Sequence, residues 1–457
     1  MKDNLISLYN KQYTIYIIHY TNSCPKLYHD GVYCTSRRLL LIVYTTSSSM
    51  FARNFELFAS RLFQYYQLLV IFAFMKSFPK ALQSKLDQRM LDQSLRQLPQ
   101  RQDAVDFASN DYLGFAQSEV IFDQSHQWLL DHHIKVNGAT GSRLISGNHP
   151  LYSNTEQYIA EFHQVEAALI FNSGYDANVG FFSAVPQRQD IILYDELCHA
   201  SIRDGIQMSK AKAYKYQHND SEDLERLLQK FSSAAGDCEI YIATESVFSM
   251  DGDSPEIETL LSLAAQYQAR LLVDEAHALG VFGSQGQGLF QERGLHDQVF
   301  ARIVTFGKGL GCHGAAVLGS QLLKDYLVNF ARSFIYTTAL SPHTVATIRV
   351  AYEQLTLQTA TRAQLRHNIQ YFNQQKKLLC LQPLFVRSIS AIQSAIIPGN
   401  HKVKQVARKL QQKGFEVKPI LSPTVPEGQE RLRICLHSYT TEAQITDLLQ
   451  LLSASVF

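Results

Sequence analysis

Apolar residues recur through the middle of this chain in short runs that are separated by longer stretches of mixed character. The runs AALIF, IILY, EIYIAT, RLLVD and RIVTF begin at Ala167 and end at Phe306, and each has the length of one buried strand. Helical or loop segments lie between them. This alternation is typical of an α/β protein with a mainly parallel sheet. The pattern therefore predicts a mainly parallel central sheet for the main body.

The end of the chain has a weaker pattern. A helical stretch is predicted from about Val345 to Gln375, followed by weak strands in IQSAIIPG and GFEVKPI and a closing helix near Glu442 to Leu452. These elements indicate a small α+β domain. The expected organisation is an N-terminal arm over 75–120, a large domain over 121–358 and a small domain over 359–457.

Residues 1–74 differ in character from the rest and are treated as an atypical extension. They are crowded with Tyr, Phe, Ile and Ser, and their apolar runs near 39–44 and 68–74 are shorter than the roughly 20 residues of a membrane-spanning helix. His19 interrupts the first apolar stretch, which argues against a signal peptide. Ordinary helical spacing begins after Met75, so our hypothesis is that Met75 is the true start. A membrane-associating or targeting extension is the rival.

Charge and cysteine content narrow the possible partners. Forty-two Lys and Arg balance forty-one Asp and Glu, for a net charge of +1, which argues against nucleic acid and anionic membranes as partners. The seven cysteines are scattered and form no Cys-x-x-Cys pair. Neither a disulfide framework nor a metal site is expected, and a reducing cytoplasm fits best.

Polar residues directly follow several of the predicted strands. Asp274 and His277 follow one strand in RLLVDEAH, Lys308 follows another in TFGKG, Ser249 lies in TESVFSMDGD, and His199 lies in LYDELCHAS. Ligands collect at the carboxyl ends of strands in open α/β sheets. Each residue alone is compatible with an ordinary structural role, but an acid, two histidines, a hydroxyl and a lysine at the ends of one sheet predict a single active site.

Lys308 stands between two glycines, an unusual place for an ammonium group. An unpaired buried ammonium is costly, and glycine permits the close approach of another group. A Schiff base with pyridoxal phosphate would explain both features, with Asp274 paired to the ring nitrogen of the cofactor. Two glycine-rich segments, Asn137 to Pro150 and Phe171 to Gly180, offer backbone amides, and the second precedes a helix whose N-terminus suits a phosphate.

Many segments of the chain together resemble the α-oxoamine synthases, a family of fold-type I pyridoxal-phosphate enzymes. The resemblance begins near Met75, runs to the C-terminus, and is strongest to the branch that makes 8-amino-7-oxononanoate for biotin. The matching motifs are DFASNDYLGFA, GATGSRLISGN, FNSGYDAN, DELCHASIRDG, TESVFSMDGD, VDEAHALGVFG, VTFGKGLG, RSFIYTTALSP and ERLRICLH.

The resemblance implies a role for each matched residue around the cofactor. Lys308 would form the Schiff base and later move the α-proton, while Asp274 would pair with the pyridine nitrogen. His277 and Ser249 would bond the phenolic oxygen, and His199 would stack on the ring. The phosphate would lie against the backbone of Gly174 and Tyr175, the hydroxyl of Thr305, and Thr338 of a second subunit, which makes a homodimer the expected assembly.

The resemblance also implies a substrate site and a reaction. Asn110 and Arg433 would hold the carboxylate of the amino acid, with Arg431 as an alternative to Arg433, and Arg96 would contribute to the acyl site. The implied reaction joins L-alanine to a pimeloyl thioester, on coenzyme A or a carrier protein, with loss of the thiol and of carbon dioxide.

Three other functions remain open on the sequence alone. Sister enzymes of the family use glycine or serine, namely 2-amino-3-ketobutyrate ligase, serine palmitoyltransferase and 5-aminolevulinate synthase, and the residues around Lys308 barely distinguish them. A plain aminotransferase would form a keto acid without consuming a thioester. A non-catalytic protein that kept the fold and the cofactor would not exchange the α-proton of an amino acid.

Overall fold

The computed structural model describes residues 6–10, 13–20, 33–35, 38–43, 78–92, 94–98, 103–232 and 238–457. The chain divides into two compact units, Met1–Leu95 and Arg96–Phe457. Met75 lies outside the described residues, so the hypothesis about the start of the chain stays a prediction. In the described part of the first unit, strands pair in the order β1-β2-β4-β3 and one helix follows. These elements are β1 (Ile6–Asn10), β2 (Tyr13–Tyr20), β3 (Tyr33–Thr35), β4 (Arg38–Val43) and α2 (Lys80–Leu91).

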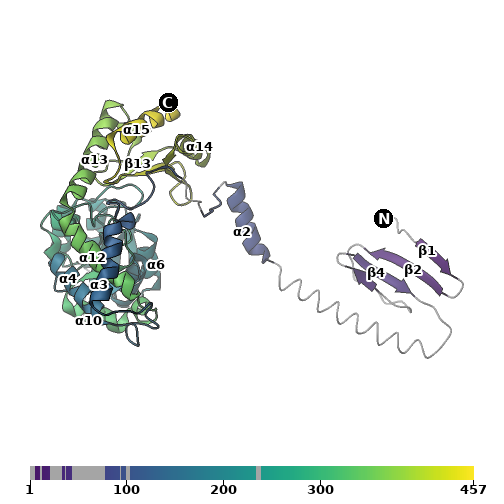
Figure 1. Ribbon diagram of the computed structural model, residues 1–457, viewed down its shortest axis with the longest axis horizontal. Helices are drawn as coiled ribbons and strands as arrows, with labels where there is room; N and C mark the ends of the chain where they lie inside the picture. The colour runs from purple at the N-terminus through teal and green to yellow at the C-terminus, as the bar shows by residue number, and fades with distance from the viewer. Residues whose placement is uncertain are drawn as a thin grey trace. The chain divides into compact units, whose positions relative to one another are not determined.

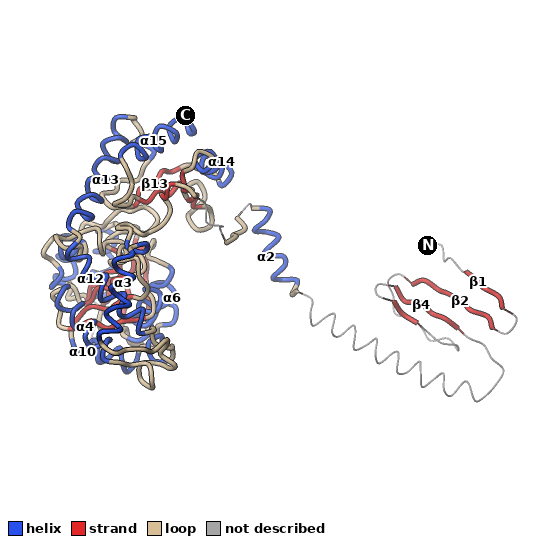
Figure 2. The backbone as a smooth tube through the Cα atoms, in the orientation of Figure 1, coloured by secondary structure: helices blue, strands red, loops and turns tan. Residues whose placement is uncertain are grey.

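The second unit is built around a large sheet, drawn in red at its centre in Figure 2. Among the described residues this sheet has seven strands in the order β6-β12-β11-β10-β9-β7-β8. All neighbours pair in parallel except β12, which is antiparallel to both β11 and β6. The strands are β6 (Ala167–Phe171), β7 (Ile191–Asp195), β8 (Lys212–Tyr216), β9 (Ile240–Glu245), β10 (Arg270–Asp274), β11 (Ala301–Thr305) and β12 (Ala315–Gly319).

The five predicted apolar runs are all strands of this sheet, and each is almost wholly buried. Two strands, β8 and β12, were not predicted. Strand β8 lies at an edge and exposes Lys212 and Lys215, so it lacks the continuous apolar run of a central strand. Strand β12 begins with two alanines after a glycine-rich loop, and its small residues form only a weak apolar run, which did not predict a strand.

Helices cover the sheet (Figure 1). Helix α5 packs against β11, β12 and α6, and α12 packs against α3 and α4. The helices are α3 (Glu119–Asp131), α4 (Pro150–Phe162), α5 (Gly174–Ala184), α6 (Ala200–Met208), α7 (Ser221–Ser232), α8 (Ile257–Gln266), α9 (Leu289–Glu292), α10 (Gln321–Phe330), α11 (Arg332–Ile335) and α12 (Pro342–Leu357). The helix predicted from Val345 to Gln375 is two helices, because Gln358 leaves the helical conformation between α12 and α13 (Thr359–Leu378).

The C-terminal elements gather at one end of this unit (Figure 1). They form a small sheet in the order β13-β16-β15, with α14 and α15 in contact with each other and α13 against α15. Strand β14 pairs in parallel with β5 from the start of the unit. The bounds are β5 (Val105–Asp106), β13 (Ile392–Ile396), α14 (Asn400–Gln411), β14 (Phe415–Glu416), β15 (Lys418–Ile420), β16 (Arg431–Cys435) and α15 (Glu442–Val456).

A buried ion pair braces the two strands that end beside the predicted site. Arg302 of β11 donates through Nη1 to Glu275, which follows β10, at 3.0 Å, and through Nη2 to the carbonyl of His163 at 2.9 Å. Both charged side chains are almost fully buried. Glu275 directly follows Asp274, so this pair fixes the backbone from which the predicted cofactor ligand projects.

None of the helices in the described part of the chain is long and apolar enough to cross a membrane.

Candidate active site

Lys308 lies at the centre of a cluster of polar side chains at the carboxyl edge of the large sheet. It sits in a tight turn after β11, where its carbonyl accepts a hydrogen bond from the amide of Gly311 (2.8 Å). Its Nζ is 2.7 Å from Nε2 of His277. Burial lowers the pKa of Lys308 to about 8, although the carboxylates of Asp274 and Glu245 oppose the shift. A lysine with this pKa has a much larger fraction of free amine near neutral pH than an ordinary lysine, as a Schiff-base nucleophile requires.

Asp274 ends β10, and two hydrogen bonds hold its side chain. Its Oδ1 accepts from the amide of Ala276 (2.9 Å), and its Oδ2 accepts from Nδ2 of Asn178 on α5 (2.8 Å). Asn178 also donates to Oγ of Ser201 (3.0 Å), which is 2.8 Å from Nδ1 of His199. A continuous hydrogen-bonded path therefore joins His199 to Asp274, and it fixes both side chains.

Glu245 is a second buried carboxyl beside Asp274. It ends β9 directly opposite Asp274 in the β9/β10 pairing, and its Oε1 accepts from the amide of His199 at 2.6 Å. Burial and the charge of Asp274 raise the pKa of Glu245 to about 8. Two carboxylates so close together do not both ionise readily, so Glu245 holds a proton near neutral pH. The sequence prediction passed over Glu245, although it belongs to TESVFSMDGD.

His277 is fixed on both sides of its ring. Its Nδ1 is 2.6 Å from the hydroxyl of Tyr112, a fully buried residue, and its Nε2 faces Lys308. Burial, followed by the positive charges of Lys308 and Arg433, lowers the pKa of His277 well below its usual range. The imidazole is therefore neutral, with one nitrogen as donor and the other as acceptor. Tyr112 was not predicted as a site residue, although it lies in DFASNDYLGFA.

We predict that Tyr112→Phe lowers kcat/KM about 2- to 10-fold, the value of one ordinary hydrogen bond. The substitution keeps the ring and removes only the hydroxyl that orients His277. Steady-state kinetics would measure the loss. Tyr152→Phe is a matched control, because Tyr152 is equally buried and donates to the carbonyl of Leu340 (3.3 Å) away from the cluster. Equal losses in both variants would contradict an orienting role for Tyr112.

The structure distinguishes between the two arginines of β16. Arg433 donates through Nη2 to Oδ1 of Asn110 (2.9 Å) and through Nε to the carbonyl of Ser249 (2.7 Å). Arg431 instead forms a buried ion pair with Asp251. Asn110 also accepts from the hydroxyl of Tyr112 (3.2 Å), so Arg433 and Asn110 adjoin the Lys308 cluster. The charge of Arg431 is already neutralised, whereas Arg433 contacts only neutral groups in these bonds.

The start of α5 forms a cradle beside Thr305. Ser173 caps the helix and bonds the amides of Asp176 and Ala177, which leaves the earlier amides of Gly174 and Tyr175 as candidates for an outside acceptor. A Cβ atom at position 174 would lie 2.3 Å from Oγ1 of Thr305, so only glycine fits there. The cradle thus combines helix amides with a hydroxyl, which is a combination suited to a phosphate.

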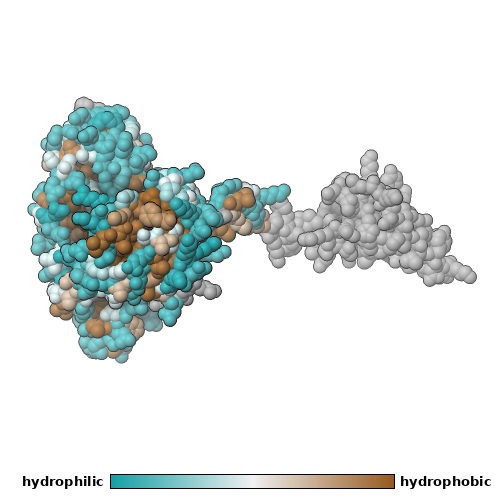
Figure 3. Space-filling view, turned by 90° about the horizontal axis from the view of Figure 1, so that it is seen from above, coloured by the Kyte–Doolittle hydropathy of each residue, from teal (hydrophilic) through white to brown (hydrophobic). Residues whose placement is uncertain are grey.

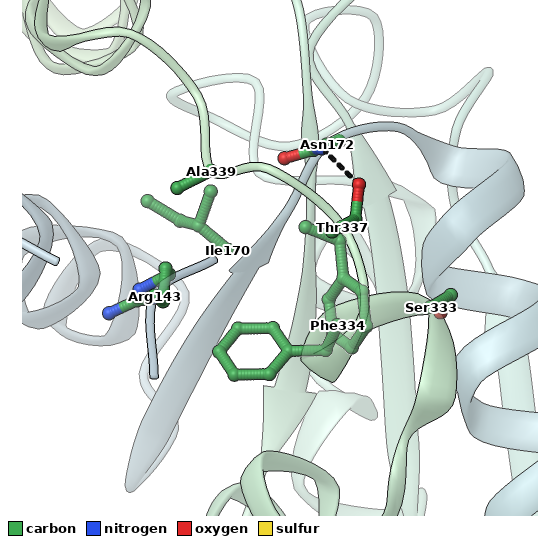
Figure 4. A pocket seen from close by; sticks show the side chains of 8 residues that line it. Arg143, Ile170, Asn172, Ser333, Phe334, Thr337 and Ala339 are labelled. Carbon is green, nitrogen blue, oxygen red and sulfur yellow. Dashed lines mark hydrogen bonds between the residues drawn. The ribbon is translucent and has the colours of Figure 1, made fainter. Parts of the chain in front are cut away.

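Thr338 contacts Asn172, the residue that directly precedes the Ser173 cap of α5. Nδ2 of Asn172 donates to Oγ1 of Thr337 (3.0 Å) and to the carbonyl of Thr338 (2.7 Å), and Figure 4 shows the Asn172 side chain pointing toward Thr337. The side chain of Thr338 is exposed.

Two predicted site residues differ from the rest in how they relate to the Lys308 cluster. Ser249 contacts the cluster through its backbone carbonyl, which accepts from Arg433. Arg96 contacts Thr424 (3.3 Å) and does not join the cluster. A search of the described residues for three or more His, Cys, Asp or Glu able to hold a metal ion finds none.

The sequence is similar to a known protein family and to characterised enzymes. Residues 102–452 match the family model for class I and II aminotransferases. The chain is 40% identical to 8-amino-7-oxononanoate synthase of Emericella nidulans over 370 residues, which cover 76% of this chain and 88% of the relative. It is 37% identical to the enzyme of the same name from Haemophilus ducreyi over 371 residues, with 77% and 92% covered.

Solved structures agree with these relatives. A serine palmitoyltransferase described with a pyridoxal-phosphate internal aldimine superposes with a TM-score of 0.74 at 25% identity, covering 82% of this chain and 96% of that one. An 8-amino-7-oxononanoate synthase from Francisella tularensis superposes with a TM-score of 0.66 at 28% identity, covering 77% and 98%. The predicted fold, a mainly parallel α/β fold of type I, is confirmed.

Proposed function

Because this chain belongs to the class I and II aminotransferase family, we propose that it condenses L-alanine with a pimeloyl thioester to give 8-amino-7-oxononanoate. The reaction forms a carbon–carbon bond at the α-carbon, expels the thiol and loses the carboxylate as carbon dioxide. The observation that carries the proposal is the position of Lys308, which contacts His277 and lies beside Asp274. Relatives that are about 40% identical to this chain are named 8-amino-7-oxononanoate synthase, after the same reaction. The enzyme is a pyridoxal-phosphate-dependent acyltransferase of biotin synthesis.

The residues present fit pyridoxal phosphate. When bound, the cofactor supplies an electron sink for the carbanion at the α-carbon of the amino acid. Asp274 would be the carboxylate for the pyridine nitrogen, since Asn178 and the amide of Ala276 hold it at the end of β10 and the neighbouring Glu245 takes a proton near neutral pH. The amides of Gly174 and Tyr175 and the hydroxyl of Thr305 would hold the phosphate, in a cradle that only glycine at position 174 permits.

The remaining groups orient the ring and move the proton. Lys308 would anchor the cofactor and then, once released, take the α-proton, because burial keeps its pKa near 8. The neutral His277, oriented by Tyr112, would bond the phenolic oxygen together with Ser249. His199, held by Ser201 and the path to Asp274, would stack on the ring face.

Arg433 and Asn110 would bind the carboxylate of alanine. A guanidinium offers two parallel donors to a carboxylate, and the Arg433 guanidinium is held in place by Asn110 and by the carbonyl of Ser249. This assignment leaves Arg431 with a structural role against Asp251. Arg96, next to Thr424, is proposed to contact the acyl substrate.

A homodimer completes the proposed site, with Thr338 reaching the phosphate of the partner. Two loops near Thr338 expose large apolar side chains, at Leu144 (52%), Ile145 (85%) and Tyr336 (73%), and are joined by a bond from the amide of Ala339 to the carbonyl of Gly141 (3.0 Å). Figure 3 shows that apolar side chains also gather on one face of this unit. Contiguous exposed apolar surface is typical of an interface. We place the enzyme in the cytoplasm, and light scattering would test the dimer.

A panel of substrates tests the proposal. The protein would be incubated with L-alanine, glycine or L-serine and a series of acyl thioesters on coenzyme A or a carrier protein, and free thiol would be measured. Release with alanine and pimeloyl thioester is expected. Release with glycine or serine alone would indicate a sister enzyme. Keto-acid formation without thiol release would indicate an aminotransferase, and the absence of any α-proton exchange would indicate a non-catalytic protein.

A further inference from the structure

His218 lies between two carboxylates outside the cluster described above. It follows β8, and its Nδ1 is 2.9 Å from Oδ1 of Asp195, at the end of β7, while its Nε2 is 2.8 Å from Oδ2 of Asp253. Ionised carboxylates only accept hydrogen bonds, so both ring nitrogens donate and the ring carries a positive charge. Burial opposes that charge, but the bonds to Asp195 and Asp253 outweigh it and raise the pKa of His218 to about 10. We call these three residues the His218 clamp.

The clamp holds both ends of the loop 246–253. The loop is the first part of the connection between β9 and α8, and the carbonyl of Asp253 at its end accepts a hydrogen bond from the amide of Phe248 (3.0 Å). The ring of Phe248 meets the ring of His218 edge-on, with centroids 4.5 Å apart. Asn219 adds a bond from Nδ2 to the same Asp253 oxygen (2.8 Å). Phe248, near the start of the loop, and Asp253, at its end, therefore both pack on one charged imidazole.

The middle of the same loop contacts the small domain at the proposed carboxylate site. The carbonyl of Ser249 accepts from Nε of Arg433 (2.7 Å), and Asp251 pairs with Arg431. Gly252 fits so tightly that a Cβ atom there would lie 2.2 Å from the carbonyl oxygen of Ile392 on β13. A shift of the loop would consequently move the acceptor that sets the direction of the Arg433 guanidinium.

We propose that His218 is a positioning residue that fixes the loop 246–253 between Asp195 and Asp253 and thereby aligns Arg433 for the carboxylate of the amino acid. The inference rests on the proposed function of Arg433 and assigns no contact between His218 and substrate. This role explains why a charged histidine, two aspartates and the closely packed Gly252 lie in or beside the loop that contacts Arg433. Without the imidazolium, Asp195 and Asp253 would face each other as two unneutralised, largely buried carboxylates.

His218→Gln tests the clamp, because glutamine keeps a donor but no charge. In the cofactor-free protein we expect faster amide hydrogen exchange in 246–253 than in the wild type. In the holoenzyme we expect KM for alanine to rise on the order of 10- to 100-fold, since a displacement of about 1 Å in a binding group has effects of this size. KM for the thioester should stay unchanged. His367→Gln is the matched control, as it removes an exposed histidine–carboxylate contact with Glu442 (2.6 Å).

A second variant covers the case in which His218→Gln does not fold. His218→Gln with Asp253→Asn removes the repulsion between the carboxylates, so the double variant should be more stable than the single variant and partly regain the wild-type KM for alanine. Unchanged exchange in the loop, or faster exchange with an unchanged KM for alanine, would overturn the proposal. A wild-type protein that turned over no amino acid would instead contradict the proposed function, and the exchange measurement, which uses no substrate, would still test the clamp.

Discussion

Lys308→Ala is expected to abolish turnover, with a loss of about 10²- to 10⁴-fold from the missing proton transfer alone. The variant would also lose the covalent link to the cofactor. Borohydride reduction of the wild type should fix pyridoxal phosphate to the peptide that contains Lys308, and reduction of the variant should fix none there. Kinetics measure the loss of turnover, and peptide mass mapping measures the loss of the covalent link.

Lys376→Ala is the control for Lys308. Lys376 is also buried, burial lowers its pKa to about 8 as well, and its Nζ donates to Oε1 of Gln393 on β13 (2.7 Å). We expect Lys376→Ala to change stability but to leave borohydride fixation at Lys308 intact. Fixation at Lys376 in place of Lys308, or full activity of Lys308→Ala, would contradict the assignment and would show that a lowered pKa alone does not identify the nucleophile.

Asp274→Asn is expected to lower kcat on the order of 10²- to 10³-fold, as removal of one group aimed at developing charge does in other enzymes. Asparagine keeps the shape and can still accept from Asn178, but it cannot stabilise a protonated pyridine nitrogen. Rates of α-proton exchange in alanine would measure the step directly, without the thioester. The dissociation constant of the cofactor should rise as well.

Asp190→Asn provides the comparison for Asp274. Asp190 is buried too, and it accepts from the amides of Gln187 and Glu239 at the opposite end of β7 from the site. Its substitution should affect stability and leave α-proton exchange close to the wild-type rate. Exchange that proceeds normally in Asp274→Asn would show that another group, with Glu245 as the first candidate, supports the ring nitrogen.

The sequence predicted those site residues that directly follow a strong apolar run. Asp274, His277 and Lys308 all do, because a buried parallel strand needs a continuous apolar sequence and its end marks the edge where ligands bind. Tyr112 and Asn178 were not predicted, since they join the site through contacts with His277 and Asp274 that span 165 and 96 residues. The periodicity of apolar residues predicts individual strands and helices, but it does not predict contacts between side chains that are far apart in the sequence.

The two arginines of β16 illustrate a different limit. Arg431 and Arg433 are two residues apart, so they project from the same face of the strand, and no local pattern separates them. Their roles diverge because Asp251 from a distant loop neutralises Arg431 while Asn110 holds Arg433. His218 was overlooked for the same reason, since its two carboxylate partners come from other segments of the chain.

Decarboxylation coupled to thiol release is the measurement that tests the proposed reaction most directly. L-alanine labelled in its carboxyl carbon would be incubated with pimeloyl thioester, and labelled carbon dioxide and free thiol would be followed together. The proposed function predicts equal amounts of both, and neither from Lys308→Ala. Thiol release without labelled carbon dioxide, or a keto acid formed with the thioester intact, would contradict it.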